Sequence, residues 1–463
     1  MPTRRYQALS VVMVGVFLST MDSGMMNVAL PTMLTAFSLT LKEVGAVVSI
    51  YLGTVTVTLV FWGRLADSFG RGGVYLAGVF VFALGLMACY VAPTFPLLVM
   101  SRLLQGLGAA MMMATGPALI KMVFPVDHLG RSLGMVGIAT ACGLLSGPFI
   151  GGLLLQYGSW RMLFLVNLPV CLLLLIFGKL WGLQRLADSA AKERVEFDWW
   201  GGCCWTFLVT VGMLLLQRFE RMGSIFTVLT LAALLVILLA FVRIEQKALR
   251  PILPLQLLRQ RYYWVALMTA MLSFATLFIV LVTTPFYLSY ILHLSAQEVG
   301  MTMTAVPAML IVLSPLSGWL YDRIGARVLT TAGLGLCFLA LLALASVGET
   351  SSTGKVALFL ALLGAGQSVF LTPNSASVLS RVDERWTGIT AGILATARNF
   401  GMVVGATLAA ALLSWWYTFY SGGQPLASYS ASDSGAFVLA VKTTFLIAAG
   451  LALLGGMFSA RRS

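Results

Sequence analysis

The chain of 463 residues is 59% hydrophobic and only 10% charged. Soluble globular proteins carry about 25% charged residues, so this composition excludes a water-soluble domain and predicts a membrane protein. The net charge of +13 does not indicate a nucleic-acid partner, because most of the Lys and Arg residues fall in the connections of one predicted membrane face.

Fourteen stretches are apolar enough to cross a hydrocarbon layer of about 30 Å, which takes roughly 20 helical residues. Alternating polar and apolar residues, the pattern of barrel strands, are not seen, so the fold class is an all-α integral membrane protein. Two stretches contain one charge each, Asp22 in Ala8–Leu30 and Arg398 in Trp386–Trp416. The twelve others, in chain order, are Val44–Gly63, Gly72–Ser101, Leu103–Ile120, Ser132–Trp160, Met162–Gly178, Trp199–Gln217, Met222–Val242, Tyr262–Gln297, Val299–Tyr321, Val328–Gly348, Val356–Ser380 and Thr443–Ala460.

The charges of the connections predict the orientation. With a cytoplasmic N-terminus, twenty-one Lys and Arg residues fall on the inner side and five on the outer side. This is the positive-inside bias, and it predicts that both termini are cytoplasmic. The first apolar stretch is too long for a cleavable signal peptide and lacks a small-residue cleavage pattern.

Cysteine and histidine give no sign of a metal site or a disulfide framework. All six cysteines fall within apolar stretches, no CxxC pair occurs, and the chain has only two histidines. These features favour buried packing cysteines, and we expect neither a metal nor another cofactor.

Asp22 is the first candidate functional residue along the chain. An ionised carboxylate in hydrocarbon is costly, and intramembrane ionisable groups are functional by default. Burial favours the neutral acid, as a proton-coupling group requires. Arg102 of the fourth span lies at a similar predicted depth, roughly 9–12 Å below the outer surface at 1.5 Å per residue. We predict that the two couple protons to transport; the alternative is a structural ion pair between the first and fourth spans.

The sequence repeats itself. The segment Gly63–Arg71 (GRLADSFGR) recurs as Gly318–Arg327 (GWLYDRIGAR), displaced by 255 residues, and the Gly-x-Gly at Gly106 returns at Gly364. This predicts two homologous six-helix halves, residues 1–183 and 262–463. Residues 184–261 would add charged cytoplasmic linkers and two further spans. Such parallel repeats are typical of alternating-access transporters, whose site lies between the halves near the midplane.

Several motifs, taken in order, resemble those of the major facilitator superfamily, in particular its fourteen-span drug:proton antiporter branch (EmrB/QacA type). The second half departs from some relatives that export cationic drugs, because it has no membrane-embedded carboxylate. A second departure is Gly72-Gly73, where further basic residues are usual. The matching segments are Asp22–Pro31, Gly63–Arg71, Arg102–Ala110, Gly143–Gly152, Trp160–Pro169, Phe197–Trp199 and Pro285–Leu288.

The resemblance implies a fold of two six-helix halves with a two-helix insertion. It implies a proton-coupled exporter of small amphipathic compounds, such as drugs or toxic metabolites, in the inner membrane of a bacterium. The expected partners are a small-molecule substrate, protons and the lipid bilayer, with a monomer as the functional unit. A periplasmic adaptor is not readable from the sequence.

The resemblance also assigns residues to the conformational switch and its gates. In the fifth span, Gly143, Gly147 and Gly151 recur every four residues, so another helix can approach that face closely. The face serves either packing alone or a sliding contact between the halves that closes a leak path. Gly401 and Gly405 give a matching face in the thirteenth span. The assigned set is completed by Gly63, Asp67, Gly70, Arg71, Pro148, Gly152, Asp322 and Arg327.

Polar and aromatic residues within the spans are candidates for a substrate cavity. Arg398 lies near mid-membrane, where it either binds an anionic substrate group or joins helices. Phe278 and the methionines at 111–113 are candidates for an adaptable apolar lining, with core or lipid packing as the alternative for each. The predicted cavity set is Asn27, Gln105, Phe286, Tyr287, Asn374, Arg398 and Asn399.

Two other function classes compete with export. An uptake symporter for a metabolite would use the same fold, but the glycine motif of the fifth span argues against it. An intramembrane enzyme using Asp22 would need a second catalytic partner, and the spans contain neither paired aspartates nor an opposed Ser/His pair. The sequence therefore predicts a transporter and not an enzyme.

Overall fold

The computed structural model describes residues 2–124, 126–183, 204, 206–208, 210–211, 233, 235–244, 257, 259–382, 384–426, 429–430 and 433–462. Every regular element among them is helical. In chain order these are α1 (Pro2–Ala36), α2 (Leu41–Phe69), α3 (Arg71–Val91), α4 (Phe95–Val123), α5 (Val126–Tyr157), α6 (Met162–Leu165), α7 (Leu168–Leu180), α12 (Arg261–Tyr290), α13 (Ala296–Met303), α14 (Ala305–Ile324), α15 (Ala326–Ala345), α16 (Thr353–Leu379), α17 (Glu384–Tyr420) and α18 (Ser434–Ala460).

The helices confirm an all-α membrane protein. Within the described part of the chain, ten helices are long and apolar enough to cross a membrane. Shorter apolar stretches lie in α2 and α5, at Glu43–Leu59 and Cys142–Tyr157. The two additional spans and most of the 184–261 linker region lie outside the described residues, so the total of fourteen stays a prediction.

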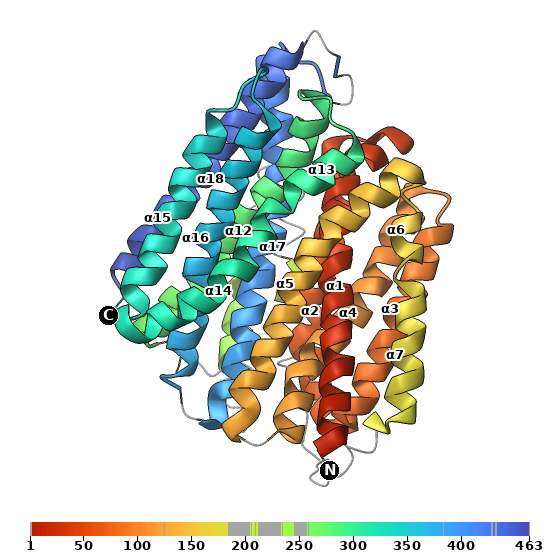
Figure 1. Cartoon of the computed structure of the whole chain (residues 1–463), viewed down its shortest axis with the longest axis vertical. Coiled ribbons are helices and arrows are strands. Elements are labelled where there is room, and N and C mark those ends of the chain that lie inside the picture. The colour runs from red at the N-terminus through yellow and green to blue at the C-terminus, as the bar shows by residue number, and fades with distance from the viewer. Residues whose placement is uncertain are drawn as a thin grey trace.

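The helices form two groups that stand side by side (Figure 1). α3, α4, α6 and α7 lie on one side, α15, α16 and α18 on the other, and α1, α2, α5, α12 and α17 between them. The strongest contacts inside each group repeat: α1 packs on α5 as α12 packs on α17, and α3 packs on α4 as α15 packs on α16. We call α1–α7 the N-half and α12–α18 the C-half. We call the end at which α1 meets α2 the outer end, after the charge-based prediction.

Helix boundaries follow local sequence signals that recur in the two halves. Thr40 and Glu43 form a capping box at the start of α2, and Ser295 with Glu298 does the same for α13. Such boxes satisfy two backbone donors that the first turn leaves free. At the opposite ends, α2 joins α3 through Gly70 (φ 91°) and α14 joins α15 through Gly325 (φ 83°). Positive φ favours glycine, which explains why the loop motif keeps a glycine there in both halves.

Two predicted spans are interrupted. The span Met162–Gly178 is split into α6 and α7 around Asn167, just before Pro169 at the start of α7. The span Val299–Tyr321 is split into α13 and α14 at Thr304. Proline lacks the backbone donor that a continuous helix would use, which accounts for the first break.

Glycine contacts give the correspondence between the halves. A Cβ on Gly108 of α4 would lie 2.7 Å from the Gly78 oxygen of α3, and one on Gly366 of α16 would lie 2.8 Å from the Gly333 oxygen of α15. Arg102 lies six residues before Gly108, and Leu360 lies six residues before Gly366. Leu360 is therefore the C-half counterpart of Arg102.

Glycine contacts also relate α1 to α12. Gly143 of α5 packs on the Phe17 carbonyl of α1, and Gly401 of α17 packs on the Met271 carbonyl of α12. Asp22 lies five residues after Phe17. The position five residues after Met271 in the C-half is therefore its counterpart, and it holds Thr276.

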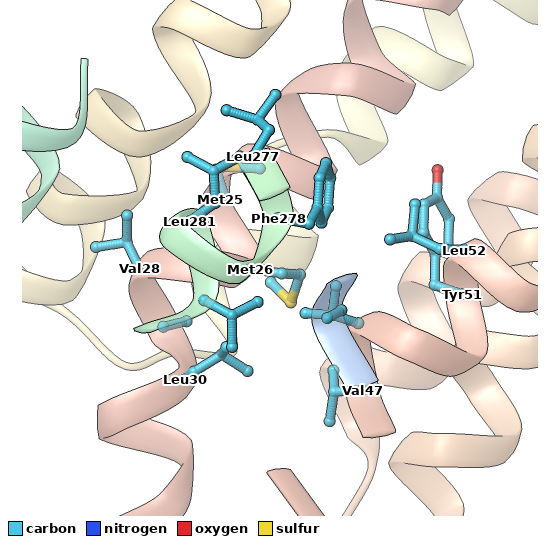
Figure 2. Close-up of a cluster of buried hydrophobic side chains, with 14 of the residues drawn as sticks. Met25, Met26, Val28, Leu30, Val47, Tyr51, Leu52, Leu277, Phe278 and Leu281 are labelled. Carbon is cyan, nitrogen blue, oxygen red and sulfur yellow. The ribbon is translucent and has the colours of Figure 1, made fainter. Parts of the chain in front are cut away.

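The halves meet along a seam at the outer end. α2 contacts α17, α5 contacts α13 and α14, and α1 contacts α12. Apolar side chains of α1, α2 and α12 interlock between the halves (Figure 2). The labelled members of this outer plug are Met25, Met26, Val28, Leu30, Val47, Tyr51, Leu52, Leu277, Phe278 and Leu281.

Candidate functional site

The predicted pair of Asp22 and Arg102 is present in the N-half core. Arg102 Nη1 donates to Asp22 Oδ2 at 2.8 Å, and both side chains are fully buried. Removing two charges from water is expensive unless the geometry and further hydrogen bonds compensate. We therefore expect further contacts around the pair that stabilise its two buried charges.

Arg102 has three further supports, two of them on α2. Its Nη1 also donates to Gln105 Oε1 at 2.5 Å, and its Nε donates to the Val47 carbonyl at 3.3 Å. The guanidinium carbon lies 4.3 Å from the centroid of the Tyr51 ring, a cation–π distance. The Tyr51 hydroxyl in turn lies 2.9 Å from Ser19 Oγ on α1.

Close helix crossings allow these contacts. A Cβ on Gly106 would lie 3.0 Å from the Tyr51 carbonyl, so the glycine lets α4 approach α2. Gly85 of α3 lies against Gln105 in the same way, with 2.5 Å between its built Cβ and the Gln105 Cα. Small residues at crossings of membrane helices permit this backbone approach. The Gly-x-Gly motif thus places the arginine one turn away among α1, α2 and α3.

Not every polar atom of the site is used. Asp22 Oδ1, Arg102 Nη2 and Gln105 Nε2 are buried and have no hydrogen-bond partner among the residues that the structure describes. Asn27 Oδ1, five residues further along α1, is also buried and has no hydrogen-bond partner among the described residues. Unsatisfied buried polar atoms are costly and native proteins keep few of them, so a cluster of them makes this region a candidate functional site.

Of the predicted cavity residues, only Gln105 joins the charged pair. Phe286 is buried and makes an edge contact with Tyr290, at 5.8 Å between ring centroids. Tyr287 donates its hydroxyl to the Gly348 carbonyl at 2.7 Å and so anchors the connection after α15. Both are buried contributors to C-half packing in this structure, and their role in a cavity stays a prediction.

Asn374 is held by the C-terminal tail. Its Nδ2 donates to the Ala266 carbonyl at 3.1 Å, and its Oδ1 accepts from Arg462 Nη1 at 2.7 Å. Arg462 also donates to Ser377 at 2.6 Å. Burial and the neighbouring Arg381 lower the pKa of Arg462 to about 10. This arrangement joins α12, α16 and the tail, which is a structural use of Asn374.

Arg398 and Asn399 lie on α17, apart from the Asp22 pair. Arg398 is half-buried and donates from Nε to its own helix, at the Leu394 carbonyl 3.4 Å away. Asn399 is buried, and its Nδ2 has no hydrogen-bond partner within the described part of the chain. Both remain candidates for contact with a substrate.

The glycine face of α5 packs on α1 of the same half, and not on the opposite half as the sliding contact considered from the sequence would require. A Cβ on Gly147 would lie 2.7 Å from the Met21 carbonyl, and one on Gly151 would lie 3.0 Å from the Met25 Cα, both on α1 of the same half. Gly401 and Gly405 pack on α12 of their own half in the same manner.

The contact between halves falls instead on the next helix face. Gly152 lies against α13, with 2.5 Å between its built Cβ and the Ala296 carbonyl, and Gly300 of α13 lies against the Pro148 carbonyl. Residues 148 and 152 are rotated by one position from 147 and 151, and this rotation turns them from α1 towards the C-half.

The loop motifs are partly described. A Cβ built on Gly63 of α2 would lie 3.8 Å from the Ala114 Cβ of α4. Arg71 begins α3, and Arg327 is exposed at the start of α15. The side chains of Asp67 and Asp322 lie outside the described residues, so their role as gate latches stays a prediction.

Four residues of the site were not singled out from the sequence. Ser19, Val47 and Tyr51 complete the surroundings of Arg102, and Gly300 faces Pro148 across the seam. Ser19 and Tyr51 are polar groups in apolar spans and could have been noticed. Val47 contributes only its backbone oxygen, so no side-chain pattern could have found it.

Metal-ligating side chains do not gather at the pair. Among the residues that the structure describes, no group of three or more His, Cys, Asp or Glu side chains could hold a metal ion. The chemistry that Asp22 itself offers is proton exchange and charge pairing.

The sequence model of the Major Facilitator Superfamily matches residues 12–406. Among curated proteins, the riboflavin transporter RibZ of Clostridioides difficile (strain 630) is 28% identical, over 98% of this chain and 96% of its own length. The multidrug resistance protein Stp of Mycobacterium tuberculosis (strain CDC 1551 / Oshkosh) is 32% identical, over 87% of this chain and 74% of its own.

Solved structures match in fold. A bacterial homologue of the human lysosomal transporter Spinster, in an inward-facing and unoccupied conformation, superposes with a TM-score of 0.71 at 12% identity. The alignment covers 99% of this chain and 97% of that one. A mutant of the peptide transporter POT, in complex with sulfate, gives a TM-score of 0.68 at 16% identity, covering 98% of this chain and 95% of that one.

Proposed function

Because the chain belongs to the major facilitator superfamily, we propose that it is a proton-coupled transporter that exports small amphipathic compounds by alternating access. Membership of the family makes it a multi-pass membrane transporter and not an enzyme. The proton coupling, the direction of transport, the inner-membrane location and the cytoplasmic termini belong to the proposal.

The observation that carries the proposal is the buried pair of Asp22 and Arg102. Protonating Asp22 would leave a buried arginine charge, which is costly when nothing else supports it. Here Gln105, the Val47 carbonyl and the Tyr51 ring already contact the guanidinium. Arg102 can therefore keep partners while Asp22 exchanges its proton, which favours a coupling role over a fixed structural bridge.

The outer seam supports alternating access. Pro148 and Gly152 meet Gly300 at backbone distance, and the apolar plug fills the space between α1, α2 and α12 (Figure 2). An exporter must close this end after each release, and close helix contacts without long side chains can form and separate with little rearrangement.

The relatives support export of amphipathic compounds. Besides the Stp protein, a tetracenomycin C resistance and export protein of Streptomyces glaucescens is 27% identical over 89% of this chain. The riboflavin transporter favours a second candidate, a carrier of a flavin-like metabolite that works as a symporter. Both candidates use the same proton site, so the direction of coupling distinguishes them.

Transport into proteoliposomes with only a pH difference imposed tests the proposal. Riboflavin and a cationic dye such as rhodamine 6G would be offered to vesicles that are acidic or alkaline inside, with protein-free vesicles as the control for passive trapping. A proton antiporter accumulates its substrate in the acidic interior, whereas a symporter accumulates it in the alkaline one. Transport that is indifferent to both gradients would contradict proton coupling.

A further inference from the structure

Tyr51 occupies a position between the charged pair and the outer seam. Its ring lies against the Arg102 guanidinium at 4.3 Å, and its hydroxyl pairs with Ser19 of α1 at 2.9 Å. The residue is 2% exposed, so both faces of the contact are inside the protein. Figure 2 shows Tyr51 and Val47 on the same helix.

α2 is joined to Arg102 at two successive turns. The Val47 carbonyl accepts from Arg102 Nε, and the Tyr51 ring lies against the guanidinium. A cation–π contact is stronger when it is desolvated than at an exposed site. A movement of the guanidinium therefore acts on α2 through two contacts, one with the Val47 carbonyl and one with the Tyr51 ring.

The same helix also forms the seam with the C-half. Ser49 Oγ lies 3.4 Å from Thr407 Oγ1 of α17, and a Cβ on Gly45 would lie 3.1 Å from the Ala410 Cβ. Ser49 is only two residues from Tyr51. Along this short piece of α2, Val47 and Tyr51 contact Arg102, whereas Gly45 and Ser49 contact α17 of the opposite half.

We propose that Tyr51 is a positioning residue that transmits the charge state of Asp22, through Arg102, to the contact between α2 and α17. When Asp22 is ionised, Arg102 divides its interactions between the carboxylate and α2. When Asp22 is neutral, the guanidinium rests more fully on the Tyr51 ring and the Val47 carbonyl. The position of α2, and with it the outer seam, then depends on the proton.

Among the residues that the structure describes, few groups that could titrate lie around this contact. Besides Asp22, Arg102 and Tyr51 itself, Cys89 of α3 interacts electrostatically with the pair, and Cys171 of α7 with Asp22. The two cysteines can be replaced without removing the charged pair. A pH effect that survives their replacement is therefore assigned to Asp22.

The test measures how the seam responds to pH. Ser49→Cys and Thr407→Cys would be introduced together in a chain whose six native cysteines are replaced by alanine or serine. The rate of disulfide formation with a membrane-permeable oxidant would be measured at about pH 5.5 and about pH 8.5. Because the thiolate fraction itself changes with pH, each rate would be divided by that of a reference pair within the C-half, Thr330→Cys with Ser459→Cys, at the same pH. Because this inference rests on the proposed function, Asp22→Asn is measured first, and we expect it to remove the pH dependence.

We expect the normalised cross-linking rate to differ about 10-fold between the two pH values with Tyr51 in place, a size set by a desolvated cation–π contact. Tyr51→Leu and Tyr51→Met, which remove the ring, should make the normalised rates nearly equal. Tyr51→Phe keeps the ring and loses only the Ser19 contact, so it should retain most of the difference. Tyr75→Leu is the matched control, since Tyr75 is a buried tyrosine of the same half whose hydroxyl bonds the Val11 carbonyl.

The outcomes separate the two claims. If Asp22→Asn keeps the pH dependence, the proton role in the proposed function is wrong. If Asp22→Asn removes it while both ring-less variants retain it, only the role of Tyr51 is wrong. Melting temperatures of the variants show whether each is folded, and the two ring-less variants of different shape guard against a folding defect in one.

Discussion

The cores of the two halves are built on the same plan and differ in charge. In the N-half, α1 and α4 meet at Asp22 and Arg102, fully buried and 2.8 Å apart. The corresponding C-half positions hold Thr276 and Leu360, also fully buried. One repeat thus holds a pair whose energy depends on a proton, and the other holds neutral groups at the same places.

The C-half core keeps a polar contact of a different kind. Ser273, the counterpart of Ser19, donates to Gln367 Oε1 at 2.8 Å, and Gln367 Nε2 returns a bond to the Ser273 carbonyl at 2.9 Å. Neutral hydrogen bonds of this kind do not change over the physiological pH range. We propose a division of work on this basis, in which the N-half responds to the proton and the C-half provides a frame against which it moves.

The largest expected effect follows from removing the carboxylate. Asp22→Asn should abolish accumulation driven by a pH difference while the protein still folds, because the amide can accept from Arg102 but cannot exchange a proton. Thr276→Val, at the corresponding C-half position, should leave coupling intact. Flux into proteoliposomes measures both, and gradient-driven accumulation by the asparagine variant would break the comparison.

The next effect concerns the seam between the halves. Gly152→Leu should hold the outer end open, because a side chain there collides with α13, whereas Gly151→Leu should disturb only the packing of α5 on α1. Overpacking of this kind costs about 1–3 kcal/mol.

Thiol labelling of cysteines near the outer end, compared with transport rate, distinguishes the two variants. We expect faster labelling and slow transport for Gly152→Leu. Normal transport with both ends still opening and closing would show that Gly152 serves packing alone.

A smaller effect is expected at the inner end of the C-half. Arg462→Gln should lower thermal stability by about 1–3 kcal/mol, since it removes hydrogen bonds from a charged donor to Asn374 and Ser377. Because the pKa of Arg462 is lowered to about 10, folded and unfolded states are both protonated below that value, and stability gains only as the pH rises above it.

The loss of stability in Arg462→Gln should therefore be the same at every pH from about 6 to about 9. Melting curves across this range measure it. A loss that varies with pH in that window would show that Arg462 is coupled to another titrating group.

The smallest effect sharpens the comparison most finely. Ser19→Ala and Ser273→Ala remove corresponding hydroxyls, and each should cost about 1 kcal/mol of stability. Only Ser19→Ala should shift the pH dependence of transport, because its partner Tyr51 lies against Arg102. Equal shifts from both variants would mean that the two cores respond alike.

The sequence predicted those features that depend on residue type and spacing. Long apolar stretches predicted the helices, and the single carboxylate in the first span led to its arginine partner. The repeated loop motif predicted two halves, residues 1–183 and 262–463, and these bounds stay a prediction. Gly70 and Gly325 could be recognised in the repeat because a backbone position with positive φ favours glycine, and a glycine can be read from the sequence.

The remaining features depend on how the helices rotate and cross. The backbone oxygen of Val47 has no signature, and the partner of Gly147 follows from a turn of one residue on α5. Asn374 has the composition of a cavity residue, yet Arg462 from the distant tail occupies its oxygen. Long-range contacts of this kind require the folded structure.

Substrate-induced proton release from the purified protein tests the central claim most directly. In weakly buffered detergent solution at about pH 7, the compound that the transport assay identifies would be added while the pH is recorded. We predict proton release from the wild type and from Thr276→Val, and none from Asp22→Asn at concentrations that still bind, as judged by a thermal shift. Equal release from Asp22→Asn would show that the proton comes from another group and would contradict the assignment of coupling to the N-half pair.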